Sequence, residues 1–240
     1  GGEVFGNSPP RQAEANAGPT PIYNGQLMAA QGYAVLYAST PLGRGATTDM
    51  TATLAAQTVA AIDAAAALGY VDPARVGVIG HSFGGYSVAA ILSHRSDRFR
   101  AGIAMDGLYD MSDNWGQRML ASLLGDHAGQ DFSLETKLMA EGAQSGLGAP
   151  FWRATEAYRR NSPIYRADKI DAPILLLHGD LNLGATSLVG AERFYAALRR
   201  EGKHPVLVRY WGESHVANDA GALRDQWRRI TAWFAHYLKR

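Results

Sequence analysis

The sequence predicts an α/β fold in which a mainly parallel sheet carries helices on both faces. Short apolar runs of strand length alternate with longer segments whose apolar residues recur at helical spacing. The apolar runs are continuous rather than alternating, which is typical of strands buried on both faces. A chain of 240 residues is long enough for one large domain of this kind and short for two.

Composition excludes several classes of protein. Hydrophobic residues make up 47% of the chain and charged residues 19%, as expected of a soluble globular domain. The net charge is +1 and the basic residues are scattered, so neither a nucleic acid nor a membrane is expected as a partner. The chain lacks cysteine, which excludes a thiol nucleophile and leaves the compartment undetermined. No metal-binding motif or phosphate-binding glycine loop occurs, so no cofactor is expected.

The elements of the N-terminal part follow in order. Residues 6–24 are rich in Pro, Gly and Asn and predict a long loop. A short helix is predicted over 26–31 and a buried strand over 33–38. Next, Thr48 or Asp49 can cap a helix whose apolar positions continue at helical spacing to Gly69.

The most informative stretch is Gly80-His81-Ser82-Phe83-Gly84-Gly85, which follows a strand predicted over 75–80 and opens a helix. A serine at such a turn is the nucleophile-elbow pattern Gly-x-Ser-x-Gly. The tight turn strains the serine backbone, and the flanking glycines keep side chains from colliding with strand and helix. The turn exposes the Ser82 hydroxyl and sets the Phe83 N–H at the helix N-terminus, where it can bind a developing oxyanion.

The pattern resumes after the elbow helix. A strand over 101–105 ends at Asp106-Gly107, and residues 108–165 then break the alternation. We expect this insertion to lie over the strand ends where substrate enters, with weak helices over 116–125 and 133–141. The remaining elements are strands over 173–178 and 206–210, a helix over 187–200 and a closing helix from about 218.

A serine hydroxyl needs a neutral imidazole to accept its proton. In the chain order typical of such elbows, that histidine follows the last strand and precedes the last helix. His215 is the one of seven histidines that stands there, so we predict it to be the general base. His178 ends a strand and is expected to have a structural role.

Three motifs together resemble one family. Gly-His-Ser-Phe-Gly-Gly at 80–85, His-Gly at 178–179 and Gly-Glu-Ser-His at 212–215 resemble the catalytic domain of the prolyl oligopeptidase family of serine peptidases. The likeness is greatest to its glutamyl endopeptidase, lasso-peptide isopeptidase and acylaminoacyl peptidase branches. It implies an α/β-hydrolase fold with its first strands missing from this chain. It also implies hydrolysis of a peptide or isopeptide bond through an acyl-enzyme on Ser82, without a cofactor.

The acid of the triad is the open point. In that family an Asp stands four residues after the His of the His-Gly motif, and Asn182 occupies this position here. An Asn can orient an imidazole but supplies no negative charge. Three readings stay open: Asp180 on the same loop is the acid, a carboxylate such as Glu192 or Glu213 substitutes, or Asn182 stands in a weakened triad. The alternative functions are accordingly an ester hydrolase and a catalytically weakened or inactive binding domain.

The resemblance also implies a second oxyanion donor, a tyrosine hydroxyl just before a Gly-Gly loop. Gly1-Gly2 resemble that loop, so the tyrosine and a preceding β-propeller are expected upstream. We therefore expect residues 1–240 to be a catalytic domain from a longer protein, and weakly active or inactive alone.

Overall fold

The computed structural model describes residues 25–45, 47–115, 138–142, 145–182 and 186–239. Within them a four-stranded sheet has the order β1-β2-β3-β4, and every neighbouring pair is parallel. The strands are β1 (Gly77–His81), β2 (Ala101–Met105), β3 (Ile174–Gly179) and β4 (Val206–Tyr210). The α-helices are α2 (Gly25–Ala30), α3 (Met50–Ala67), α4 (Phe83–Arg95), α7 (Thr155–Arg160), α8 (Leu188–Arg200) and α9 (Ala220–Leu238).

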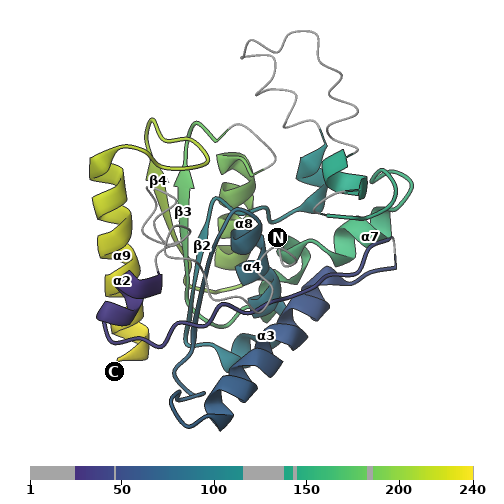
Figure 1. Cartoon of the computed structure of the whole chain (residues 1–240). Helices are drawn as coiled ribbons and strands as arrows, with labels where there is room; N and C mark the ends of the chain where they lie inside the picture. The colour runs from purple at the N-terminus through teal and green to yellow at the C-terminus, as the bar shows by residue number, and fades with distance from the viewer. Residues whose placement is uncertain (1–24, 46, 116–137, 143–144, 183–185, 240) are drawn as a thin grey trace.

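The helices cover both faces of the sheet (Figure 1). Because successive side chains of a strand point to opposite faces, each strand contributes to two cores. One core joins the sheet to α3, α4 and α8 and includes Leu54, Leu92, Ala104, Leu176 and Phe194. The other joins it to α2 and α9 and includes Met28, Ile103, Leu177, Ile230 and Phe234. The predicted parallel sheet with helices on both faces is confirmed.

Most predicted elements are found within two residues of their expected ends. The strands over 101–105 and 206–210 agree residue for residue. Asp49 caps α3, since its side chain accepts a hydrogen bond from the Ala52 N–H at 2.9 Å. None of the described helices is long and apolar enough to cross a membrane.

The prediction of a strand over 33–38 is wrong. The structure has no strand there, and Val35, Leu36 and Tyr37 are 41%, 51% and 56% exposed. An apolar run becomes a strand only where a neighbouring strand pairs with it, and the described sheet ends at β1. The local pattern carries no information about that partner.

The insertion is described only in part. The helix predicted over 116–125 and most of the one over 133–141 lie outside the described residues, and Leu138–Gly142 forms a π-helical turn. Short 3₁₀ segments at Ser96–Arg98, Met111–Asn114 and Pro163–Lys169, together with α7, were not predicted. Asn161 ties this region to α3, because its Oδ1 accepts from the Met50 N–H at 2.7 Å and its Nδ2 donates to the Thr48 carbonyl at 2.9 Å.

Candidate active site

Ser82 lies at the sharp turn between β1 and α4. Its φ of 60° and ψ of −119° place it in a region that L-residues rarely adopt. Gly80 is required there, because an added Cβ would collide with the backbone of Gly84. The expectation for Gly84 itself is wrong: its Cβ would meet nothing within 4 Å, whereas a Cβ on Gly85 would lie 2.6 Å from the Met105 carbonyl oxygen.

The structure brings Ser82 and His215 together. His215 follows β4, and its Nε2 lies 2.8 Å from the Ser82 Oγ. His81 supports the loop from below, because its Nε2 lies 2.6 Å from the carbonyl oxygen of His215 and a carbonyl can only accept. The two imidazole rings lie 4.8 Å apart between centroids. The His215 Nε2 is thus within hydrogen-bond reach of the Ser82 hydroxyl.

Asn182 and Thr186 lie on the other side of His215. The Asn182 Nδ2 is 3.1 Å and the Thr186 Oγ1 is 3.2 Å from His215 Nδ1. The Thr186 hydroxyl also donates to Asn182 Oδ1 at 3.2 Å, and His178 Nε2 donates to the Thr186 carbonyl at 2.7 Å. Asn182 is only 4% exposed. The family's acid position is therefore in contact with the imidazole, as an amide.

The other carboxylates considered from the sequence have different contacts. Asp180 accepts a hydrogen bond from the Gly212 N–H at 2.7 Å. Glu213 accepts from the N–H groups of Asn218 and Asp219 at 2.7 and 3.1 Å, just before α9. Glu192 pairs with Arg209. Each of these three has a described structural partner, and for none is a contact with His215 described.

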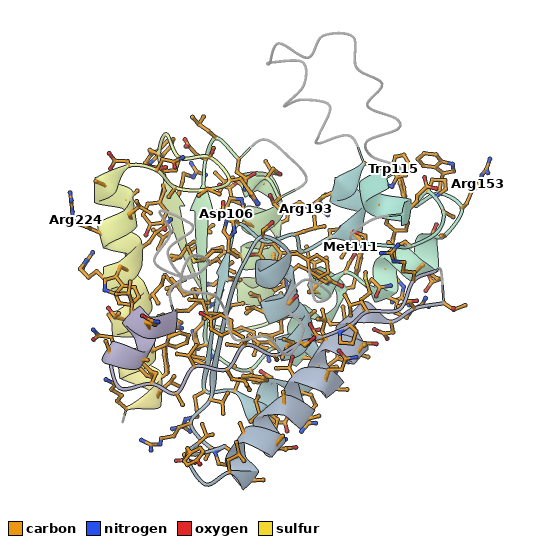
Figure 2. All side chains as sticks on the ribbon, in the orientation of Figure 1. Asp106, Met111, Trp115, Arg153, Arg193 and Arg224 are labelled. Atoms are coloured by element: carbon orange, nitrogen blue, oxygen red, sulfur yellow. The ribbon has the colours of Figure 1, made fainter. Side chains whose placement is uncertain are left out.

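Asp106 is the carboxylate that lies nearest. It follows β2, is 3% exposed, and its Oδ1 accepts from the Asn182 Nδ2 at 3.0 Å and from the Gly179 N–H at 3.1 Å. In Figure 2 it lies at the strand ends, whereas Trp115 and Arg153 lie farther out beside α7. Its φ is 47°, and Ser82 and Asp106 are the two non-glycine residues with positive φ in the described part of the chain.

Burial dominates the electrostatics around Asp106. It raises the pKa of Asp106 to about 7, although the hydrogen bonds from Gly179 and Asn182 lower it. Burial also lowers the pKa of His178 to about 4, and it lowers the pKa of His81. Both rings lie 3.8 Å from a carboxylate oxygen of Asp106. Near neutral pH both histidines are therefore uncharged and do not neutralise Asp106.

Asp106 and Thr186 were not predicted from the sequence as members of the site. The signal for Asp106 is its place directly after a buried strand that neighbours the elbow strand, since strand ends of a parallel sheet converge on one edge. For Thr186 the only signal is a hydroxyl on the loop that carries Asn182. Neither belongs to the three motifs at 80–85, 178–179 and 212–215.

Fold and site together define the class. A parallel sheet whose elbow serine meets a histidine on the loop after the last strand is the arrangement of the α/β hydrolases. Residues 21–240 match the sequence profile of the prolyl oligopeptidase family, and the chain belongs to that family.

Individual relatives agree. The chain is 27% identical over 233 residues to the uncharacterized peptidase YuxL of Bacillus subtilis, an alignment that covers 92% of this chain and 32% of that protein. It is 31% identical over 163 residues to a probable chloroplastic glutamyl endopeptidase of Arabidopsis thaliana, covering 68% of this chain and 14% of the relative. The chain thus spans about a third or less of the length of these relatives.

Solved structures show the same fold. A puromycin-hydrolyzing peptidase of Mycobacterium tuberculosis superposes with a TM-score of 0.60 at 27% identity, over 78% of this chain and 25% of the other. An acylaminoacyl peptidase of Pyrococcus horikoshii superposes with a TM-score of 0.58 at 25% identity, over 76% of this chain and 27% of the other. The prediction of an α/β-hydrolase fold of the prolyl oligopeptidase type is confirmed.

Proposed function

We propose that this chain carries the catalytic site of a serine peptidase that hydrolyses peptide bonds through an acyl-enzyme. The observation that carries the proposal is the 2.8 Å contact between the Ser82 Oγ and His215 Nε2 at a strained elbow. The chain belongs to a peptidase family, and this supports the choice of a peptide as the substrate class.

The chemistry assigns a role to each group. Ser82 Oγ attacks the scissile carbonyl carbon while its proton moves to His215 Nε2. The Phe83 N–H, at the first residue of α4, stabilises the oxyanion. His215 then protonates the leaving amine as the C–N bond breaks. Water, activated by the same histidine, attacks the ester and releases the acid and the free serine.

We further propose that substrate approaches over the insertion at 108–165. Its described part carries a cluster of aromatic rings. The ring centroids of Trp115 and Trp152 are 4.7 Å apart, and those of Phe151 and Trp152 are 5.2 Å apart. Trp152 is 58% exposed, so this cluster presents aromatic surface to solvent. Aromatic surface of this kind binds apolar side chains of a peptide.

A fluorophosphonate probe tests the nucleophile in the full-length protein. The probe should label the wild type and not the Ser82→Ala variant, which removes the hydroxyl and changes nothing else. Matched peptide and ester substrates with the same acyl group then separate a peptidase from an ester hydrolase. A wild-type protein that the probe does not label contradicts the proposal and favours the binding-domain alternative.

A further inference from the structure

We propose that the buried carboxylate of Asp106 supplies the negative charge that this site needs, and that Thr186 and Asn182 transmit it to His215. This inference rests on the proposed function. It replaces the usual direct carboxylate–imidazole contact with a chain of three hydrogen bonds. Asp106, Asn182 and Thr186 are positioning residues in this arrangement, because none of them touches the reacting atoms.

The orientation of the Asn182 amide follows from its two neighbours. Its Nδ2 lies 3.0 Å from Asp106 Oδ1, and an ionised carboxylate only accepts. Its Oδ1 lies 3.2 Å from the Thr186 hydroxyl, which donates to it. The amide group therefore presents its NH₂, a donor, toward the side of His215.

His215 must carry its proton on Nδ1 if Nε2 is to accept the serine proton. That N–H requires an acceptor, and the NH₂ of Asn182 is not one. Of the two contacts described at Nδ1, the Thr186 Oγ1 at 3.2 Å is the one that can accept. The network runs from His215 Nδ1–H to Thr186 Oγ1, from its hydroxyl to Asn182 Oδ1, and from Asn182 Nδ2–H to Asp106. In it the 3.1 Å contact between Asn182 Nδ2 and His215 Nδ1 joins two donors and is not a hydrogen bond.

The Asp106 carboxylate lies close enough to His215 to stabilise its imidazolium form. Asp106 Oδ1 and His215 Nδ1 both contact the Asn182 Nδ2, at 3.0 and 3.1 Å, so they are no more than about 6 Å apart. Among the residues that the structure describes, the other titratable groups around Asp106 are His81 on β1, His178 on β3 and the phenol of Tyr109. Burial lowers the pKa of both histidines and raises the pKa of Tyr109, so all three are neutral near pH 7. Above about pH 7, where Asp106 itself is ionised, the carboxylate field is therefore unopposed when the His215 imidazolium forms, and no proton needs to move along the network.

Moving the negative charge from position 106 to position 182 tests the inference in the full-length protein. At pH 8, where Asp106 is ionised, Asp106→Asn should lower kcat by about a hundredfold, the factor that attraction across about 6 Å provides at an effective dielectric constant near 20. It should also move the acid limb of the kcat/KM profile to lower pH, because the negative charge that favours the protonated form of His215 is removed. Adding Asn182→Asp to this variant places a carboxylate directly on His215 and should restore kcat. Asn182→Asp alone should not exceed the double variant, because two carboxylates about 3 Å apart cannot both ionise.

The role of the Thr186 hydroxyl is tested by a matched pair of variants. Thr186→Val keeps the shape and removes the acceptor, whereas Thr186→Ser keeps the hydroxyl; only the first should slow turnover. The ¹⁵N chemical shifts of His215 should report the Nδ1–H tautomer in the wild type and a shift toward Nε2–H in Thr186→Val.

The outcomes separate the two proposals. An Asp106→Asn variant with wild-type kcat and pH profile overturns the inference and leaves the serine peptidase standing. A double variant no faster than Asp106→Asn also overturns it, because the loss would then be structural. A wild-type protein without turnover contradicts the proposed function, and the His215 tautomer still decides the network: an Nε2–H ring refutes it.

Discussion

Replacing Asp106 with Asn should stabilise the fold above pH 7. Burial raises the pKa of this carboxyl from 3.8 to about 7, so the folded protein holds the proton more tightly than the unfolded chain does. For an acid with a raised pKa, the contribution to stability is fully present below about pH 4. It is lost progressively as the pH rises to about 7 and stays lost above that value.

The magnitude follows from the two pKa values. Their separation of about 3 corresponds to a cost of about 4 kcal/mol for ionised Asp106 at pH 8. The side chain is only 4% exposed, so solvent screens little of this cost. Asn has the same shape, tolerates a φ of 47°, and its Oδ1 can accept the hydrogen bonds from Gly179 and Asn182. Asp106→Asn should thus equal the wild type in stability near pH 4 and exceed it by up to about 4 kcal/mol at pH 8.

Urea denaturation of both proteins from pH 4.5 to pH 8.5 measures this difference. His81 and His178, whose pKa values burial lowers, make both proteins less stable as the pH falls below about 6.5. Subtracting the two stability curves removes these shared contributions and leaves that of Asp106. A difference that does not grow with pH, or a variant less stable than the wild type at pH 8, would refute the reasoning.

Two further predictions concern the elbow and the loop after β3. Gly85→Ala should cost about 1–3 kcal/mol or more of folding free energy, because its Cβ would lie 2.6 Å from the Met105 carbonyl. Gly84→Ala, whose Cβ meets nothing within 4 Å, is the matched control in thermal denaturation and should change stability little. Asp180→Ala should leave kcat within about threefold of wild type, since the carboxylate binds the Gly212 N–H; a loss of a hundredfold or more in steady-state assays would restore Asp180 as the acid.

The fold was predictable where local sequence determines it. The run at 101–105 is apolar, the run at 206–210 is apolar apart from Arg209, and both are of strand length. Asp49 places a capping side chain directly before a helical pattern. The segment 33–38 has an equally apolar pattern and failed, since a strand depends on a partner that its own residues do not specify. Helix starts are encoded within a few residues, whereas strand pairing is not.

The residues of the site differ in the same way in how far local sequence predicts them. Ser82 and His215 could be predicted because each follows a recognisable strand and precedes a helix. For Asp106 the sequence shows only its place at the end of a strand, because its contact with Asn182 depends on the register between β2 and β3. Met105 pairs with Leu177, and this pairing sets Asp106 against the loop that carries Asn182. A one-residue change in register would turn the carboxylate away from the loop.

The energetics of Asp106 bear on whether the domain is a catalyst or a binding scaffold. Its carboxyl is buried between two neutral histidines, with a positive φ and a pKa near 7, so the ionised form destabilises the fold. An Asn would satisfy the same hydrogen bonds without that cost. A scaffold without catalysis gains nothing from the charge, whereas a serine hydrolase needs a negative field where the imidazolium forms. The ionised Asp106 destabilises the fold beside the position where Asn182 supplies no negative charge to the His215 imidazolium. This coincidence favours a working enzyme over a scaffold.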